Sequence, residues 1–146
     1  MTHIDFYFNA HDRLQVACRL AAKAMKQGQR LLVYAPDAET ASRIDRMLWT
    51  WPAIGFVPHC ALQAPLAADT PVLIGSGDEA PPGGAADCEV LLNLGAECPP
   101  HFERFTRLLE VVSADEADKE KGRSRFRFYR ERGYKIAHHD LAQSNE

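Results

Sequence analysis

Short hydrophobic segments alternate with segments of helical periodicity along this chain. Polar and apolar residues alternate in the segment 3–8, which is also rich in aromatic side chains. Both features are typical of a β-strand. In the segment that follows, apolar residues recur at the spacing of one helix face; they are Leu14, Cys18, Ala21 and Met25. Asp12 is a suitable cap for the start of this helix, and Gly28 is a suitable residue to end it.

Further strands are predicted by short apolar runs. The runs over 30–35, 71–76 and 88–94 are continuous, as in strands that are covered on both faces. Residues 109–113 predict another strand, and residues 134–139 predict a last strand at an edge of the sheet.

Helices are predicted between these strands. One begins near Asp37, a suitable cap, and its inward stripe consists of Ala41, Ile44 and Leu48. A short helix with proline at its start is predicted over 99–109, and a charged helix over 114–132 that Gly133 ends. Strands that alternate with helices predict an α/β fold with a mainly parallel, twisted sheet and helices on both faces.

The overall composition narrows the class of protein. At 146 residues we expect one domain over 1–140, followed by a flexible tail over 141–146. The formal net charge of −3 at pH 7 argues against a dedicated binder of duplex DNA. The four cysteines have no C-x-x-C spacing, and the N-terminus has no signal-peptide pattern. Because no apolar run is long enough to span a membrane, we expect a cytoplasmic protein with reduced thiols.

The sequence contains no recognisable catalytic, cofactor or metal site. Residues 75–80 fit G-x-G-x-x-A, but the prolines and glycines of 81–84 cannot propagate the helix that a Rossmann-like dinucleotide site requires. Three potential metal ligands are adjacent, but neighbours on an extended chain point to opposite faces; they are His138, His139 and Asp140. We therefore expect no enzymatic activity, no cofactor and no metal.

A run of arginines marks the end of the charged helix. Positions 123, 126, 127 and 130 share a helical face, which presents three guanidinium groups around the ring of Phe126. A solvated charged helix would explain the charges alone. The interleaved aromatic residues favour a ligand that is partly apolar. Single-stranded nucleic acid and an acidic peptide with a terminal carboxylate both fit, and composition does not decide between them.

Both tryptophans lie in residues 46–59, at a helix end and in the loop after it. Trp51 fits both the inward stripe of the helix and the interface, and the sequence does not decide between them. Trp49 is offset from the stripe by one residue and lies at its border. A proline-bounded loop that displays Trp49, Phe56 and Val57 is typical of a protein interface, although a role in the core is an equal alternative.

Together these segments resemble the chi subunit of bacterial DNA polymerase III holoenzyme. The resemblance is specific in the combination of "LW…FVPH" with "RSRFRFYRERGY", and "VLLNLG" and "RLLEVV" also fit. It implies an α/β fold and a non-enzymatic accessory subunit that pairs with the psi subunit, which tethers it to the clamp-loader complex. It also implies binding to the acidic C-terminal tail of single-stranded DNA-binding protein, and hence an indirect contact with single-stranded DNA during replication.

The resemblance also implies residue roles. The psi-contacting motif is matched by Trp49, Phe56, Val57, Pro58 and His59. The basic tail-binding helix is matched by Arg123, Phe126, Arg127 and Arg130, and Val112 is assigned to the apolar rim of the tail pocket.

Overall fold

The computed structural model describes residues 2–50, 59–61, 72–75 and 89–143. Its described strands form one seven-stranded sheet in the order β3-β4-β2-β5-β6-β1-β7. Every pairing in this sheet is parallel, which confirms the predicted fold class. The strands are β1 (His3–Ala10), β2 (Leu31–Tyr34), β3 (His59–Ala61), β4 (Val72–Gly75), β5 (Val90–Asn93), β6 (Arg107–Ser113) and β7 (Ile136–Asp140).

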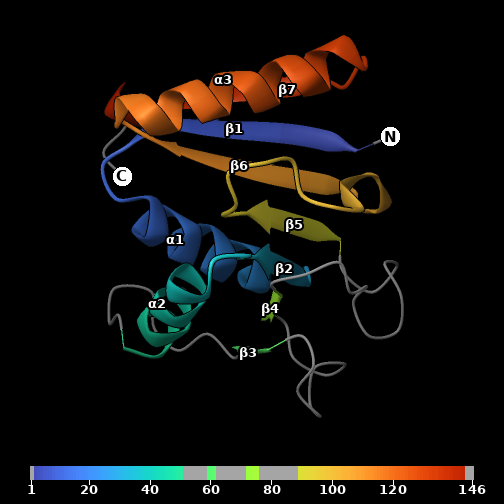
Figure 1. Cartoon of the computed structure of the whole chain (residues 1–146). Helices are drawn as coiled ribbons and strands as arrows, with labels where there is room; N and C mark the ends of the chain where they lie inside the picture. Colours follow the sequence, from blue (N-terminus) through green and yellow to red (C-terminus); the bar gives the residue numbers. More distant parts are fainter. Residues whose placement is uncertain (1, 51–58, 62–71, 76–88, 144–146) are drawn as a thin grey trace.

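Three helices cover the two faces of the sheet (Figure 1). Helices α1 (Arg13–Lys26) and α2 (Ala38–Thr50) share a core with Leu31 and Val33 of β2. Helix α3 (Glu116–Glu131) contributes to a second core, which contains Leu32 of the same strand. Because successive strand residues point to opposite faces, α3 lies on the face opposite α1 and α2. The expectation of helices on both faces is confirmed.

The helix ends follow the predicted signals. The Asp12 carboxylate accepts hydrogen bonds from the amides of Leu14 and Gln15 at 3.0 and 3.2 Å. At the start of α2, the Asp37 carboxylate accepts one from the Thr40 amide at 3.0 Å. The two predicted stop glycines have φ angles of 75° and 83°, a backbone region that glycine enters at little cost; they are Gly28 and Gly133.

The predicted helix over 99–109 is wrong. The structure has only a three-residue 3-10 helix, Phe102–Arg104, and β6 already begins at Arg107. Two features prevent a longer helix. His101 adopts a left-handed conformation with φ 61°, and residues from Arg107 onward pair with both β5 and β1. Pairing in the middle of the sheet prevails over local helix propensity here.

Two short elements near the edges of the sheet were not predicted from the sequence, namely β3 and the 3-10 helix after β7. The strand β3 was not predicted, because three residues are too few for an alternating pattern to be recognised. At the opposite edge lies β7, as predicted for the last strand, and it pairs with β1. After it, Leu141–Gln143 form a 3-10 helix, and Leu141 packs against Ala10 and Val16. The domain boundary after residue 140 stays a prediction.

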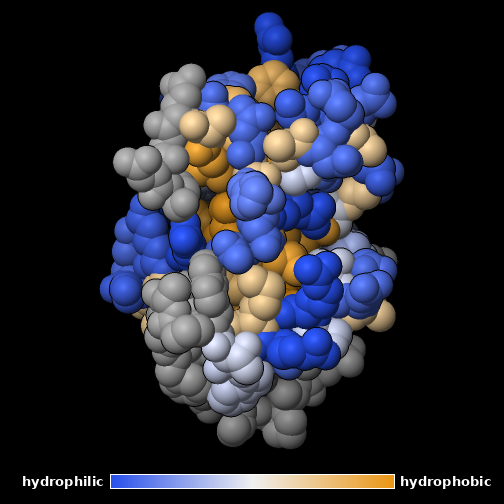
Figure 2. Space-filling view, turned by 90° about the vertical axis from the view of Figure 1, so that its left-hand side faces the viewer, coloured by the Kyte–Doolittle hydropathy of each residue, from blue (hydrophilic) through white to orange (hydrophobic). Residues whose placement is uncertain are grey.

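Figure 2 views the molecule from the carboxyl-terminal ends of the strands. Hydrophobic side chains lie in the hollowed centre of this face, and hydrophilic side chains surround them. None of the helices in the described ranges is both long and apolar enough to cross a membrane.

Candidate functional site

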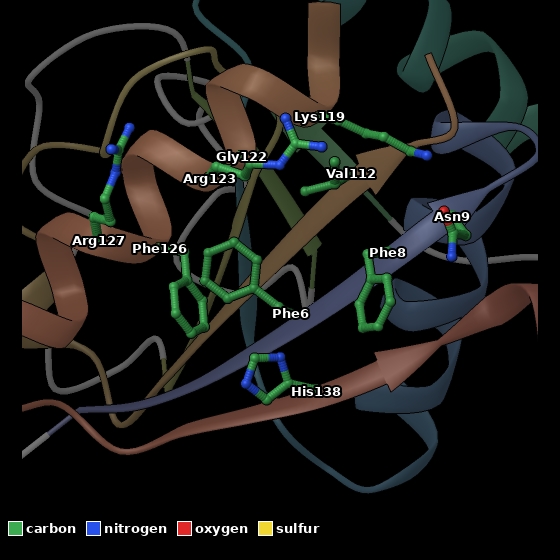
Figure 3. Close-up of a pocket in the computed structure, with 10 residues that line it drawn as sticks. All are labelled: Phe6, Phe8, Asn9, Val112, Lys119, Gly122, Arg123, Phe126, Arg127 and His138. Atoms are coloured by element: carbon green, nitrogen blue, oxygen red, sulfur yellow. The ribbon is translucent and has the colours of Figure 1, made fainter. Parts of the chain in front are cut away.

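A cavity of about 610 Å³ lies between α3 and the strands β1, β6 and β7 (Figure 3). Each of these elements contributes side chains or backbone to its wall. The lining residues are Phe6, Phe8, Asn9, Val112, Lys119, Gly122, Arg123, Phe126, Arg127 and His138.

The inner part of this cavity is apolar. Phe6 of β1 is buried, and its ring meets the ring of Phe126 edge to face with centroids 5.6 Å apart. Val112 of β6 is also buried, and Phe8 packs against the same core cluster. A partner with an apolar side chain therefore finds a surface that it can cover without leaving polar groups unpaired.

Cationic side chains stand along one side of the cavity. Lys119, Arg123 and Arg127 are four residues apart on α3, so they follow one another along the same side of the helix. The lining residues that the structure describes include no carboxylate. Although the whole chain carries a formal charge of −3, this cavity is locally basic.

Four of the five predicted tail-binding residues line this one cavity, namely Val112, Arg123, Phe126 and Arg127. Arg130 is exposed and is not among the lining residues. The pattern of the helix alone did not reveal Phe6, Phe8 or His138, which come from strands distant in sequence. Lys119 precedes the arginine run by one helical turn, and the periodicity of the helix was a signal for it.

Another arginine of the same run, Arg125, is buried between α3 and the sheet. The Arg125 guanidinium donates from Nε to the Glu110 carboxylate at 2.9 Å, and the Tyr129 hydroxyl donates to the same carboxylate at 2.6 Å. Asn93 completes the set with its amide nitrogen 3.1 Å from both carboxylate oxygens. Burial raises the pKa of Glu110, while these donors oppose that rise. The network fixes α3 on β5 and β6.

The close approach of α3 to the sheet depends on a glycine. A Cβ atom at Gly122 would lie 2.8 Å from Cγ2 of Val112, which is shorter than real Cβ contacts. The absence of a side chain therefore lets the helix pack against β6 at the wall of the cavity.

A second candidate surface lies at the end of α2, on the opposite side of the sheet. Trp49 is 58% exposed, and it is the only exposed large hydrophobic side chain among the residues that the structure describes. Its ring meets the His59 imidazole with centroids 4.8 Å apart. The predicted residues Phe56, Val57 and Pro58 lie outside the described part of the chain, as does Trp51.

His59 is placed beneath Trp49 rather than beside it on the surface. Its side chain is fully buried, and Nε2 lies 3.1 Å from both the backbone oxygen and a carboxylate oxygen of Asp45.

The adjacent histidines of β7 point to opposite faces, as expected. His138 approaches Phe126 with ring centroids 5.1 Å apart, whereas His139 stacks on Tyr7 at 4.4 Å. The His139 imidazole also lies 3.0 Å from the Asp5 carboxylate. Burial favours the neutral acid, but His139 and Arg107 together hold the pKa of Asp5 below its usual value. Within the described ranges, no group of three His, Cys, Asp or Glu residues is arranged to hold a metal ion.

Cys18 and Cys98 are free thiols. Cys18 is buried in the core under α1, where burial raises the pKa of its thiol to about 12. A thiol that stays protonated is a poor nucleophile, so this cysteine contributes packing rather than reactivity.

Comparison with known proteins identifies the family of this chain. Residues 1–137 match the family model described as DNA polymerase III chi subunit, HolC. The DNA polymerase III subunit chi of Pseudomonas aeruginosa is 39% identical, over 97% of this chain and 98% of the relative. The subunit of the same name from Escherichia coli is 27% identical, over 84% of this chain and 81% of the relative. The chain therefore belongs to the family of DNA polymerase III chi subunits.

Proposed function

We propose that this chain is a non-catalytic adaptor of the replicative polymerase with two separate protein-binding surfaces. One surface, the cavity beside α3, binds the acidic C-terminal tail of single-stranded DNA-binding protein. The other, around Trp49, pairs with the psi subunit and so attaches the chain to the clamp loader. The observation that carries the proposal is the cavity itself, in which apolar walls and a row of cations meet.

The chemistry of the cavity fits a peptide end better than a nucleic-acid strand. Carboxylates of a tail would pair with the guanidinium groups of Arg123 and Arg127, and an apolar side chain would cover Phe126. Single-stranded nucleic acid instead needs aromatic faces that are open for stacking. Phe6 is buried and Phe126 is only partly exposed, so the rings offer apolar walls more than stacking platforms.

A paired titration separates these two ligands. A synthetic acidic peptide that ends in phenylalanine and a bare single-stranded oligonucleotide are each titrated into the protein at the same salt concentration. We expect a micromolar dissociation constant for the peptide, because the contact is small. The affinity should fall as the salt concentration rises, because the contact is electrostatic. Binding of the oligonucleotide without binding of the peptide would favour a direct nucleic-acid module and contradict the proposal.

The exposed indole of Trp49 supports the second surface. Tryptophan anchors buried at protein interfaces commonly contribute about 2 kcal/mol or more of binding free energy. We expect Trp49→Ala to weaken psi binding by at least that amount and to leave peptide binding unchanged, since α2 and α3 lie on opposite faces of the sheet. Arg123→Ala should have the reverse effect. If both substitutions weakened the binding of the same partner, the assignment of two surfaces would be wrong.

A further inference from the structure

The cavity beside α3 has a side that the helix does not provide. Figure 3 shows Lys119, Arg123 and Arg127 on α3 along one side, and His138 of β7 on the other. The rings of Phe6, Phe126 and Phe8 lie between the two sides. A ligand seated on these rings would therefore have cationic groups of α3 on one flank and an imidazole on the other.

The position of His138 is defined by its ring contacts. The imidazole is tilted against Phe126 with centroids 5.1 Å apart, and it meets Phe8 edge to face at 6.3 Å. Histidine is the side chain whose charge ordinarily changes between pH 5 and 8.

The polar and charged groups on this side of the sheet come from three elements. Helix α3 provides Lys119, Arg123 and Arg127, all positive, and β1 provides only the neutral Asn9. On β7 itself, the Asp140 carboxylate accepts hydrogen bonds from Asn9 at 2.9 Å and from the Ala142 amide at 3.0 Å. His139 faces the other side of the sheet, where it contacts Asp5.

We propose that His138 is a binding residue of this cavity and that its protonation makes the binding of an acidic, apolar peptide dependent on pH. This inference rests on the proposed function of the cavity. A bound carboxylate attracts a protonated imidazole at its side, so binding and protonation favour each other. The complex should take up a proton when it forms near neutral pH.

The test is a titration of the acidic peptide ending in phenylalanine at pH 5.8 and at pH 8.0, at one ionic strength. Peptide carboxylates stay ionised across this range, so their charge does not change. We expect the wild-type protein to bind about three- to fivefold more tightly at pH 5.8, the effect of one additional exposed ion pair. His138→Gln should bind equally at both pH values, with the affinity that the wild type has at pH 8.0.

Two further variants control for other causes. His138→Lys places a permanent charge at this position, so it should bind tightly at both pH values. His139→Gln changes the neighbouring imidazole on the opposite face and should keep the pH response of the wild type. Circular dichroism at both pH values checks that each variant is folded.

The outcomes separate this inference from the proposed function. If the wild type binds the peptide equally at both pH values, or if His138→Gln keeps the pH response, the role of His138 is refuted while the cavity stays a peptide site. If the wild type binds no peptide at either pH, the proposed function fails, and the inference fails with it.

Discussion

Helix α3 has two faces that use arginine for opposite purposes. On the face toward the sheet, Arg125 is 3% exposed and pairs with a carboxylate that is completely buried. Two residues to either side, Arg123 and Arg127 are exposed and line the cavity. Among the described residues no ion pair is formed by either of them. The same guanidinium group is a structural anchor in one position and is available to a ligand in the other.

The role of each arginine therefore depends on its position around the helix axis and not on its residue type. Positions 122, 125 and 129 are three and four residues apart, and all three are buried against β6. Positions 123 and 127 are rotated away from that stripe. The anchored face therefore holds the helix in place, while the other face presents its charges beside a preformed apolar wall.

The largest effect is expected when the buried arginine of α3 is removed. Arg125→Ala leaves the Glu110 carboxylate buried without its cationic partner, and the loss of one member of a buried pair costs about 3–5 kcal/mol. We expect the free energy of unfolding, measured by urea denaturation, to fall by that amount.

A double variant shows whether the uncompensated charge is the cause. Glu110→Gln combined with Arg125→Met removes both charges, so it should lose much less stability than Arg125→Ala. An unchanged free energy of unfolding in Arg125→Ala would show that the anchored face does not need its ion pair.

A smaller loss is expected where the helix approaches the sheet most closely. Gly122→Ala places a methyl group against Val112, and overpacking of this kind costs about 1–3 kcal/mol. The measurement is again urea denaturation. Val112→Ala makes room for the methyl group. Gly122→Ala should therefore lower the free energy of unfolding less in a Val112→Ala background than in the wild type. Purely additive effects would contradict the close contact.

The smallest effect is expected at Arg130, which sharpens the boundary of the binding face. This residue is exposed and does not line the cavity. Arg130→Ala should change the free energy of unfolding by no more than about 0.5 kcal/mol. It should also weaken peptide binding less than Arg127→Ala does, as measured by calorimetric titration. A larger loss for Arg130→Ala would extend the site along the helix toward its C-terminus.

Much of the fold was predictable because its elements carry local signals. Alternation and short apolar runs located six of the seven strands, and Asp12, Asp37, Gly28 and Gly133 marked helix ends through their own backbone chemistry. The failures arose where non-local pairing decides the structure. The chain before β6 is drawn into the middle of the sheet at Arg107, and β3 is defined by its pairing with β4 alone.

The candidate site was predictable only on the side that one helix provides. Periodicity grouped Arg123, Phe126, Arg127 and Arg130. The first three line the cavity, and the role of Arg130 stays a prediction. The opposite side depends on the order of strands, which places β1 beside both β6 and β7. Phe6 and His138 come together through that order, and no local pattern announces it.

On the proposed function, the exposed face of α3 binds a ligand without stabilising the fold. The most direct test measures peptide affinity and unfolding free energy for Arg123→Ala combined with Arg127→Ala. We expect the dissociation constant of the acidic peptide ending in phenylalanine to rise about tenfold, the loss of two exposed ion pairs, while the unfolding free energy stays within about 0.5 kcal/mol of the wild type. An unchanged dissociation constant, or a loss of stability as large as that expected for Arg125→Ala, would contradict the account.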